Sequence, residues 1–284
     1  MNRLGLAELA DWMGQGPPWR AFGLAFFAGL IASLAMAPFH FAPVLLFSFT
    51  ILTWLLDGVS HLAGWRGLRA AAARGWWFGF GFFLSGLYWI GFALTVDAEN
   101  FAHFIPMAVV ALPAGLAAFV ALATLLAKLG WRTGSPARVL LLALCWSLGE
   151  WLRGHLFTGF PWNLIGYAWA TDAAPGLWVM QSAAFTGVYG LSLISVALAA
   201  LPAILTQDGP RGWRISLLLL LTGFAMLSGM AAYGALRLSH TPPEDVAGVR
   251  LRIVQPNIEQ AAKWLPEHRA AIFGTLIDLS SAPA

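Results

Sequence analysis

The chain alternates between long apolar runs and short polar connections. A helix needs about 20 mostly apolar residues, within a range of about 17–25, to cross the hydrocarbon core of a bilayer. Each such run must be helical, because an isolated strand would leave backbone groups unpaired in lipid. Seven runs reach or approach this length, at residues 21–37, 41–59, 75–96, 104–128, 136–152, 177–205 and 214–236. The pattern therefore predicts an α-helical polytopic membrane protein with about seven transmembrane helices, the sixth of them tilted or broken at one end.

The pattern changes after Leu236, where a polar linker containing two prolines separates the last apolar run from the C-terminal residues. Apolar residues alternate with arginines over residues 249–253, which is the period-2 signature of a half-buried strand. A helix is predicted to begin at Pro266, because proline and an acidic residue are favoured in a first turn. One strand and one helix cannot bury a core. We therefore predict a transmembrane helical domain over residues 1–240 and the first βα unit of a soluble α/β domain over residues 241–284.

The composition supports a membrane protein and excludes several other classes. Hydrophobic residues make up 59% of the chain and charged residues only 10%, whereas soluble domains carry about 25% charged residues. The basic residues are scattered and form no stripe, so we predict no binding to nucleic acid. The single cysteine, Cys145, excludes an internal disulfide and a multi-cysteine metal site. No histidine spacing or phosphate-binding motif indicates a metal or cofactor, and we predict neither.

The basic residues also predict an orientation, because cytoplasmic connections carry an excess of Lys and Arg. With a cytoplasmic N-terminus, the three opposite connections contain one basic residue, Arg153. The basic residues on the cytoplasmic side would be Arg3, Arg20, Arg66, Arg69, Arg74, Lys128, Arg132, Arg138, Arg211 and Arg214. Seven spans would then place the C-terminal tail outside, which in a bacterial inner membrane is the periplasm.

The most distinctive segment is residues 145–169, which we call the rim segment. The segment begins inside an apolar run, which ends at the polar residues Glu150 and Arg153. These two residues are three positions apart and can pair on one helix face. Ionisable residues near membrane depth are costly and often functional. Three interpretations stay open for this pair. It could be an ion pair that orients the rim, it could contact a substrate head group, or Glu150 could act as an acid or base.

The turn that follows contains Phe160, Pro161 and Trp162 after Gly159. Exposed Phe and Trp residues commonly form an aromatic belt at a membrane surface. However, glycine and proline fix a particular backbone path, and irregular backbone at membrane depth is tolerated where it is buried or lines a cavity. The sequence favours the belt and the cavity wall equally.

Four motifs along nearly the whole chain carry a family resemblance. The third and fourth are specific in this order, and the glycine pattern alone is weak. The motifs are Ala37-Pro38-Phe39 before Pro43, Gly79/Gly81/Gly86/Tyr88/Trp89, Glu150 with Arg153-Gly154 leading to Phe157-Thr158-Gly159-Phe160-Pro161-Trp162, and Val254-Gln255-Pro256-Asn257-Ile258 with Gln260 and Lys263-Trp264. With these motifs the chain resembles the bacterial apolipoprotein N-acyltransferases.

The resemblance implies a membrane domain followed by a periplasmic nitrilase-like (carbon-nitrogen hydrolase) domain, of which residues 241–284 would be the N-terminal fragment. It implies transfer of an acyl chain from a phospholipid to the N-terminal diacylglyceryl-cysteine amine of lipoproteins, in lipoprotein maturation. The partners would be a phospholipid acyl donor, a diacylglyceryl-modified lipoprotein acceptor and membrane lipids. Family members are thought to use a Glu-Lys-Cys triad, with the cysteine forming a thioester. We expect that triad beyond residue 284, and we expect the chain as given to be inactive alone.

The resemblance is carried over to six positions of this chain as candidates for substrate binding, and to none as catalytic. These are Trp264, Trp162, Pro161, Phe160, Arg153 and Glu150. Trp264 belongs to the Lys-Trp motif and would lie near the entrance for the acyl substrate, although it could equally be a core aromatic residue. The alternative function is a non-catalytic lipid-binding or scaffolding membrane protein. A transporter ranks last, because paired broken helices around a midplane site are not evident.

Overall fold

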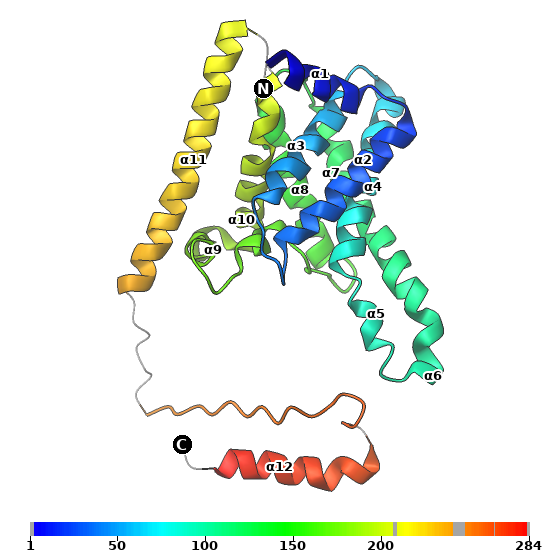
Figure 1. The fold of residues 1–284 in the computed structure, drawn as a ribbon, viewed down its shortest axis with the longest axis vertical. Helices are drawn as coiled ribbons and strands as arrows, with labels where there is room; N and C mark the ends of the chain where they lie inside the picture. The colour runs from blue at the N-terminus through cyan, green and yellow to red at the C-terminus, as the bar shows by residue number, and fades with distance from the viewer. Residues whose placement is uncertain (1–2, 207–208, 241–247, 264, 283–284) are drawn as a thin grey trace.

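A computed structural model describes residues 3–206, 209–240, 248–263 and 265–282 (Figure 1). The described secondary structure is helical, and no strand is assigned in these ranges. The longer helices are α1 (Arg3–Gly14), α2 (Pro18–Ala32), α3 (Val44–Asp57), α4 (Gly64–Gly86), α7 (Leu112–Leu129), α8 (Ala137–His155), α10 (Ala183–Ala200), α11 (Gly209–His240) and α12 (Arg269–Ser281). Short helical segments are η1 (Ser33–Ala35), α5 (Ile90–Ala93), α6 (Ala98–Phe101), η2 (Ala102–Phe104), η3 (Met107–Ala111), η4 (Ile165–Trp169), α9 (Gly176–Met180), η5 (Leu201–Thr206) and η6 (Pro266–His268).

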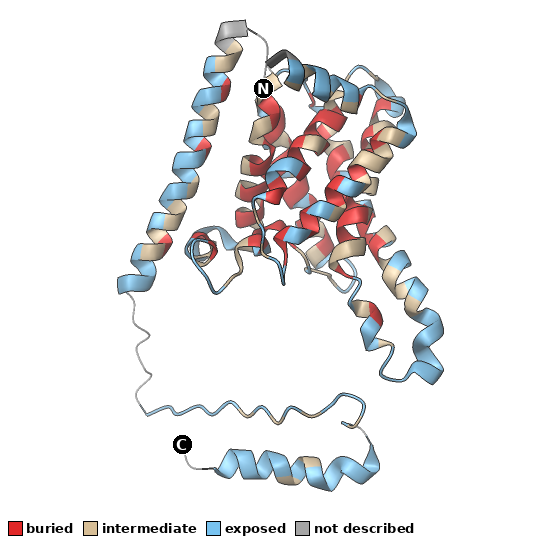
Figure 2. Cartoon of the chain, in the orientation of Figure 1, coloured by how far each residue is buried: buried red, intermediate tan, exposed pale blue. Residues whose placement is uncertain are grey.

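Helices α2, α3, α4, α7, α8 and α10 form a bundle that holds the buried core (Figure 2). At its centre, the Trp146 ring of α8 meets Phe49 of α3 and Phe78 of α4 edge-on, with ring centroids 4.8 and 5.7 Å apart. Edge-to-face contact is a preferred geometry for aromatic pairs. Helix α11 lies along one side of the bundle and meets α9 and η5 (Figure 1). Trp146 therefore packs α8 into the core, close to the end of this helix where the candidate site lies.

Small residues let the helices of the bundle approach closely. A Cβ added at Gly79 would lie 3.1 Å from the Ala117 Cα of α7, and one at Gly81 would collide with the Phe26 carbonyl of α2. These two glycines of α4 therefore serve helix packing. In α10, Gly187 breaks the helix with φ +62°, which confirms a broken end in the sixth apolar run.

Within the described residues, four helical stretches are long and apolar enough to cross a membrane by length and composition: Pro18–Ala35, Ala98–Leu129, Ala183–Thr206 and Gly212–His240. This count does not support the predicted seven spans. The shortfall has a physical cause in each remaining helix. Helix α3 has only 14 residues, and α4 and α8 each contain three charged residues that lower their hydropathy.

The C-terminal prediction is half correct. A helix follows Pro266 as predicted, formed by η6 and α12. The strand predicted over residues 249–253 is wrong for this structure, where these residues have no regular secondary structure. A strand is stabilised by hydrogen bonds to a neighbouring strand, and the described residues offer none. The described residues after 247 include no buried residue, and the division at residue 240 stays a prediction.

Candidate functional site

The rim segment forms one end of the bundle, opposite the end where α1 lies (Figure 1). Helix α8 ends at His155, and the backbone then turns sharply before η4 begins. Positive φ angles mark this turn, 56° at Phe157, 74° at Gly159 and 53° at Asn163. Such angles are uncommon outside glycine and need support from surrounding contacts. Two buried side chains of α8 supply that support.

Arg153 is buried, with 2% of its surface exposed. Its Nη1 donates hydrogen bonds to the carbonyl oxygens of Phe160 and Trp162, each at 2.6 Å. The Phe160 amide donates in return to the Arg153 carbonyl at 2.8 Å. The guanidinium also lies over the Phe83 ring of α4, 4.9 Å from its centroid. Charge-assisted hydrogen bonds of this length are strong, so Arg153 fixes the aromatic turn to α8.

Glu150 is buried as well, with 5% exposed. Its Oε1 accepts hydrogen bonds from the Ile165 amide at 2.8 Å and from the Trp146 indole at 3.0 Å. Ile165 is the first residue of η4, and the first amides of a helix have no partner within it. Glu150 therefore holds the start of η4 against α8.

A direct ion pair between Glu150 and Arg153, one of the three interpretations that the sequence left open, is not formed. The ion pair found in the described ranges is Asp57–Arg138, at the other end of the bundle. Glu150 and Arg153 share a face of α8, but each reaches backbone groups of the turn instead of the other side chain. Their arrangement is a clamp, in which one side chain binds two carbonyls and the other binds an amide.

The exposed side of the turn is aromatic. Trp162 has 51% of its surface exposed, and its ring lies 5.8 Å from that of Phe160. Phe157 is almost fully exposed, and Pro161 is half-buried. The turn thus presents aromatic surface outward while its carbonyls point to Arg153. This geometry fits both the belt and the cavity wall predicted from the sequence.

A small cavity lies beside the clamp, lined by Glu150 and Arg153 and by aromatic residues of α4 and α8. Its volume is about 10 Å³, which is room for roughly one water molecule. Glu150 Oε2 and Arg153 Nη2 are buried without a protein partner. An acyl chain or lipid head group does not fit this space. The geometry favours positioning roles for both residues.

Three residues of this site, Trp146, Ser192 and Ser195, were not predicted from the sequence. Trp146 precedes Glu150 by four positions, a spacing that predicts contact on a helix and could have been noticed. Ser192 and Ser195 of α10 support the same region. The Gly166 amide donates to Ser192 Oγ and the Trp169 indole donates to Ser195 Oγ, both at 2.8 Å. These serines are 26 positions away from their partners, so no local sequence pattern predicts these contacts.

The structure brings five of the six predicted site residues together: Glu150, Arg153, Phe160, Pro161 and Trp162. The sixth, Trp264, lies outside the described residues. In the described part of the chain, no group of three or more His, Cys, Asp or Glu side chains could hold a metal ion.

The described residues include four apolar helices of spanning length, which define a multi-pass membrane protein. At one end of its bundle, a buried polar clamp holds a turn with exposed aromatic residues. Residues 28–201 match the family model described as "Apolipoprotein N-acyltransferase N-terminal domain". This match covers more than half of the chain, which therefore belongs to that bacterial membrane family. The resemblance inferred from the motifs is confirmed.

Similar curated proteins carry the name apolipoprotein N-acyltransferase. The one from Rhodopseudomonas palustris is 44% identical over 284 residues, covering 99% of this chain and 51% of that protein. The one from Allorhizobium ampelinum is 46% identical over 268 residues, covering 93% and 49% respectively. The one from Brucella suis is 44% identical over 287 residues, covering 98% and 52%. The chain thus spans about half the length of the curated relatives it matches.

Proposed function

We propose that this chain forms the membrane part of an apolipoprotein N-acyltransferase. The reaction is transfer of an acyl chain from a phospholipid to the N-terminal amine of a diacylglyceryl-cysteine lipoprotein. The observation that carries the proposal is the family match over residues 28–201, which includes the whole rim segment. The buried clamp gives this segment a defined shape, as a surface that receives lipid substrates requires.

Within this function, Glu150 and Arg153 are positioning residues, because their bonds hold the turn and η4. Trp162 and Phe160 form the surface that contacts acyl chains, and Pro161 fixes the backbone between them. Aromatic side chains supply large apolar contact area with little conformational entropy to lose. Trp264 is proposed to contact the same acyl substrate near its entrance.

The proposed setting is the bacterial inner membrane, with the N-terminus in the cytoplasm and the rim segment facing the periplasm. Its basis is the charge asymmetry of the connections. All seven apolar runs coincide with helical segments, and we propose seven spans. The shorter α3 and the charged α4 and α8 would cross inside the bundle, shielded by their neighbours. Residues 241–284 would begin the nitrilase-like domain, whose strand forms once a neighbouring strand is present.

A chimera tests the function. This chain would replace the matching half of the Rhodopseudomonas palustris relative, and the chimera would be reconstituted in phospholipid vesicles with a diacylglyceryl-cysteine peptide. The measurement is acyl transfer to the peptide amine, followed by mass spectrometry. We expect transfer by the chimera and a fall of about tenfold or more in kcat/KM for Trp162→Ala, which corresponds to about 1.4 kcal/mol of lost contact.

The matched control is Trp65→Ala, which removes a tryptophan that is even more exposed than Trp162, at the opposite end of the bundle. Its kcat/KM should stay within about twofold of the parent. A correctly inserted chimera that transfers no acyl group would refute the enzymatic proposal. If such a chimera still crosslinked to a photoreactive phospholipid at the rim segment, the non-catalytic lipid-binding alternative would replace it.

A further inference from the structure

Arg74 is a buried arginine of α4, at the end of the bundle opposite the rim segment. Only 6% of its surface is exposed. Its Nη1 donates to the Ala70 carbonyl of the same helix at 3.0 Å, and its Nε is buried without a hydrogen-bond partner. An arginine side chain stays charged at all physiological pH values and carries five N–H donors. Most of its hydrogen-bonding capacity is therefore unused by the described residues.

The two other arginines that are buried among the described residues have more partners. Arg138 forms an ion pair with Asp57 at 3.2 Å, and Arg153 binds two carbonyls and a ring face. In the described ranges, no Asp or Glu forms an ion pair with Arg74. A buried charge without a counter-charge is costly. Among these buried arginines, Arg74 has the fewest partners, and a bound anion would supply the missing counter-charge and hydrogen-bond acceptors.

Arg74 lines a pocket of about 750 Å³ between the start of α2 and the connection from α3 to α4. The polar side chains that line the pocket with it are Gln15 and His61, and no acidic residue lines it. Helix α2 has 15 residues and begins here at Pro18. Its N-terminus adds a positive dipole end, which favours anions. The pocket is therefore electropositive and open to hydrogen-bond acceptors.

Features around the pocket indicate that the anion belongs to a lipid. Exposed tryptophans occur on the three helices at this end, Trp12 on α1, Trp19 on α2 and Trp65 on α4. Exposed tryptophans of membrane proteins concentrate at the lipid headgroup level. The apolar ring of Phe22 also lines the pocket. Basic pockets between transmembrane helices commonly bind anionic lipid head groups.

We propose that Arg74, with Gln15, His61 and the start of α2, binds the phosphate-containing head group of an anionic lipid from the leaflet at this end of the bundle. This site is separate from the rim segment and from the proposed acyl transfer. It would anchor the bundle to one leaflet through a charge for which the described residues supply no acidic partner.

The test measures binding of phosphatidylglycerol to the full chain by native mass spectrometry and by titration in nanodiscs of phosphatidylcholine. Arg74→Gln should weaken phosphatidylglycerol binding about tenfold or more, because charge-assisted hydrogen bonds to the phosphate are lost. Arg74→Lys keeps the charge and should bind more tightly than Arg74→Gln. The matched control is Arg69→Gln, which removes the same charge from an exposed position of the same helix and should stay within about twofold of the parent.

Equal binding by the parent chain and Arg74→Gln would overturn the proposal. Displacement of the bound lipid by inorganic phosphate at equal concentration would overturn its assignment to a lipid. A second measurement uses only the parent chain, in case Arg74→Gln does not fold. Amides of residues 14–16 and 19–21 should exchange more slowly in phosphatidylglycerol nanodiscs than in phosphatidylcholine nanodiscs, and equal exchange would refute the site.

Discussion

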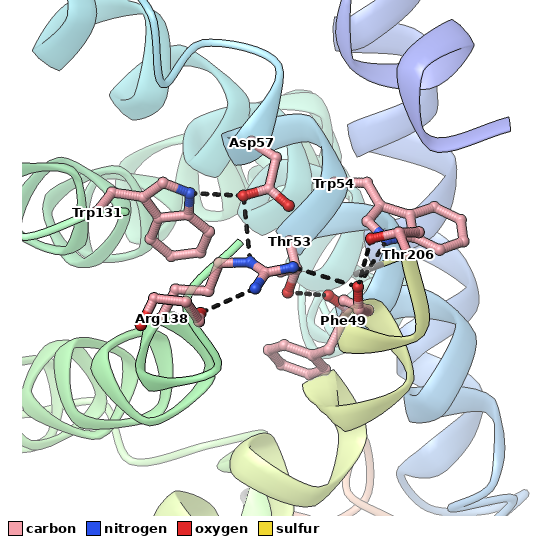
Figure 3. A network of polar contacts seen from close by, with 9 residues as sticks. Phe49, Thr53, Trp54, Asp57, Trp131, Arg138 and Thr206 are labelled. Atoms are coloured by element: carbon pink, nitrogen blue, oxygen red, sulfur yellow. Dashed lines mark hydrogen bonds and ion pairs between the residues drawn. The ribbon is translucent and has the colours of Figure 1, made fainter. Parts of the chain in front are cut away.

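The two ends of the bundle use an acid and an arginine in opposite ways. At the end where α1 lies, Asp57 of α3 and Arg138 of α8 form a direct ion pair at 3.2 Å (Figure 3). The Trp131 indole donates to the same Asp57 oxygen at 2.8 Å, and Arg138 Nη2 donates to the Ala203 carbonyl of η5 at 3.2 Å. At the rim, Glu150 and Arg153 form no direct ion pair, and each binds the backbone of the turn.

The two arrangements therefore stabilise different parts of the molecule. The Asp57–Arg138 network ties two helices and η5 directly to one another, so it belongs to the architecture of the bundle. The rim clamp ties an irregular turn to a single helix, so it sets the shape of a surface. Breaking the Asp57–Arg138 pair should therefore destabilise the whole fold. Breaking the rim clamp should lower stability too, but it should loosen the turn in particular. Four substitutions test this comparison, in order of decreasing effect.

Asp57→Ala should have the largest effect. It leaves the Arg138 charge buried without its partner, which costs about 3–5 kcal/mol in the free energy of unfolding. The measurement is denaturant-induced unfolding in detergent micelles. Asp11→Ala, at an exposed position of α1, serves as the control and should change stability by about 0.5 kcal/mol or less. A loss below about 1 kcal/mol for Asp57→Ala would mean that the ion pair does not hold the bundle.

Arg153→Met should follow, with a loss of about 3 kcal/mol, because two charge-assisted hydrogen bonds to carbonyls disappear. Hydrogen exchange should show faster exchange confined to residues 156–165, in contrast to a uniform change for Asp57→Ala. Arg132→Met removes an exposed arginine and should leave both measurements nearly unchanged. Uniform loosening of the bundle by Arg153→Met would erase the distinction between the two ends.

Gly159→Ala should cost about 2 kcal/mol in the free energy of unfolding, because φ is +74° and the new Cβ would collide with the Gly154 carbonyl. Gly134→Ala provides the control, since its φ of +82° is similar and no atom lies within 4 Å of the added Cβ. That control should cost about 1 kcal/mol, from backbone conformation alone. Equal losses in the two variants would show that the turn at the rim is not tightly packed.

Glu150→Gln should have the smallest effect, about 1 kcal/mol or less, because the amide oxygen can still accept from Ile165 and Trp146. Glu150→Ala should cost about 2–3 kcal/mol, since two buried donors lose their acceptor. Exchange of the Ile165 amide reports the same contrast directly. If Glu150→Gln were as damaging as Glu150→Ala, the negative charge would matter at the rim, as it does at Asp57.

The family and the general architecture could be read from the amino-acid order. The motifs around Glu150 and Trp162 are continuous in the sequence, so they can be recognised before folding. The span count could not be settled in the same way. Helices such as α4 and α8 carry charges whose cost depends on the neighbours that bury them, and those neighbours come from distant parts of the chain.

The helices of the bundle coincide with apolar runs, because helical hydrogen bonds join residues four apart and need no distant partner. Helix α1 and the start of α4 at Gly64 lie outside these runs. The spacing of Glu150 and Arg153 likewise puts them on one face without further information. Their partners were decided only by the tertiary structure. The turn at Gly159 brings the carbonyls of Phe160 and Trp162 back to Arg153, and η4 brings the Ile165 amide to Glu150. The same dependence on distant partners explains the strand missing at residues 249–253, whose hydrogen bonds require a neighbouring strand.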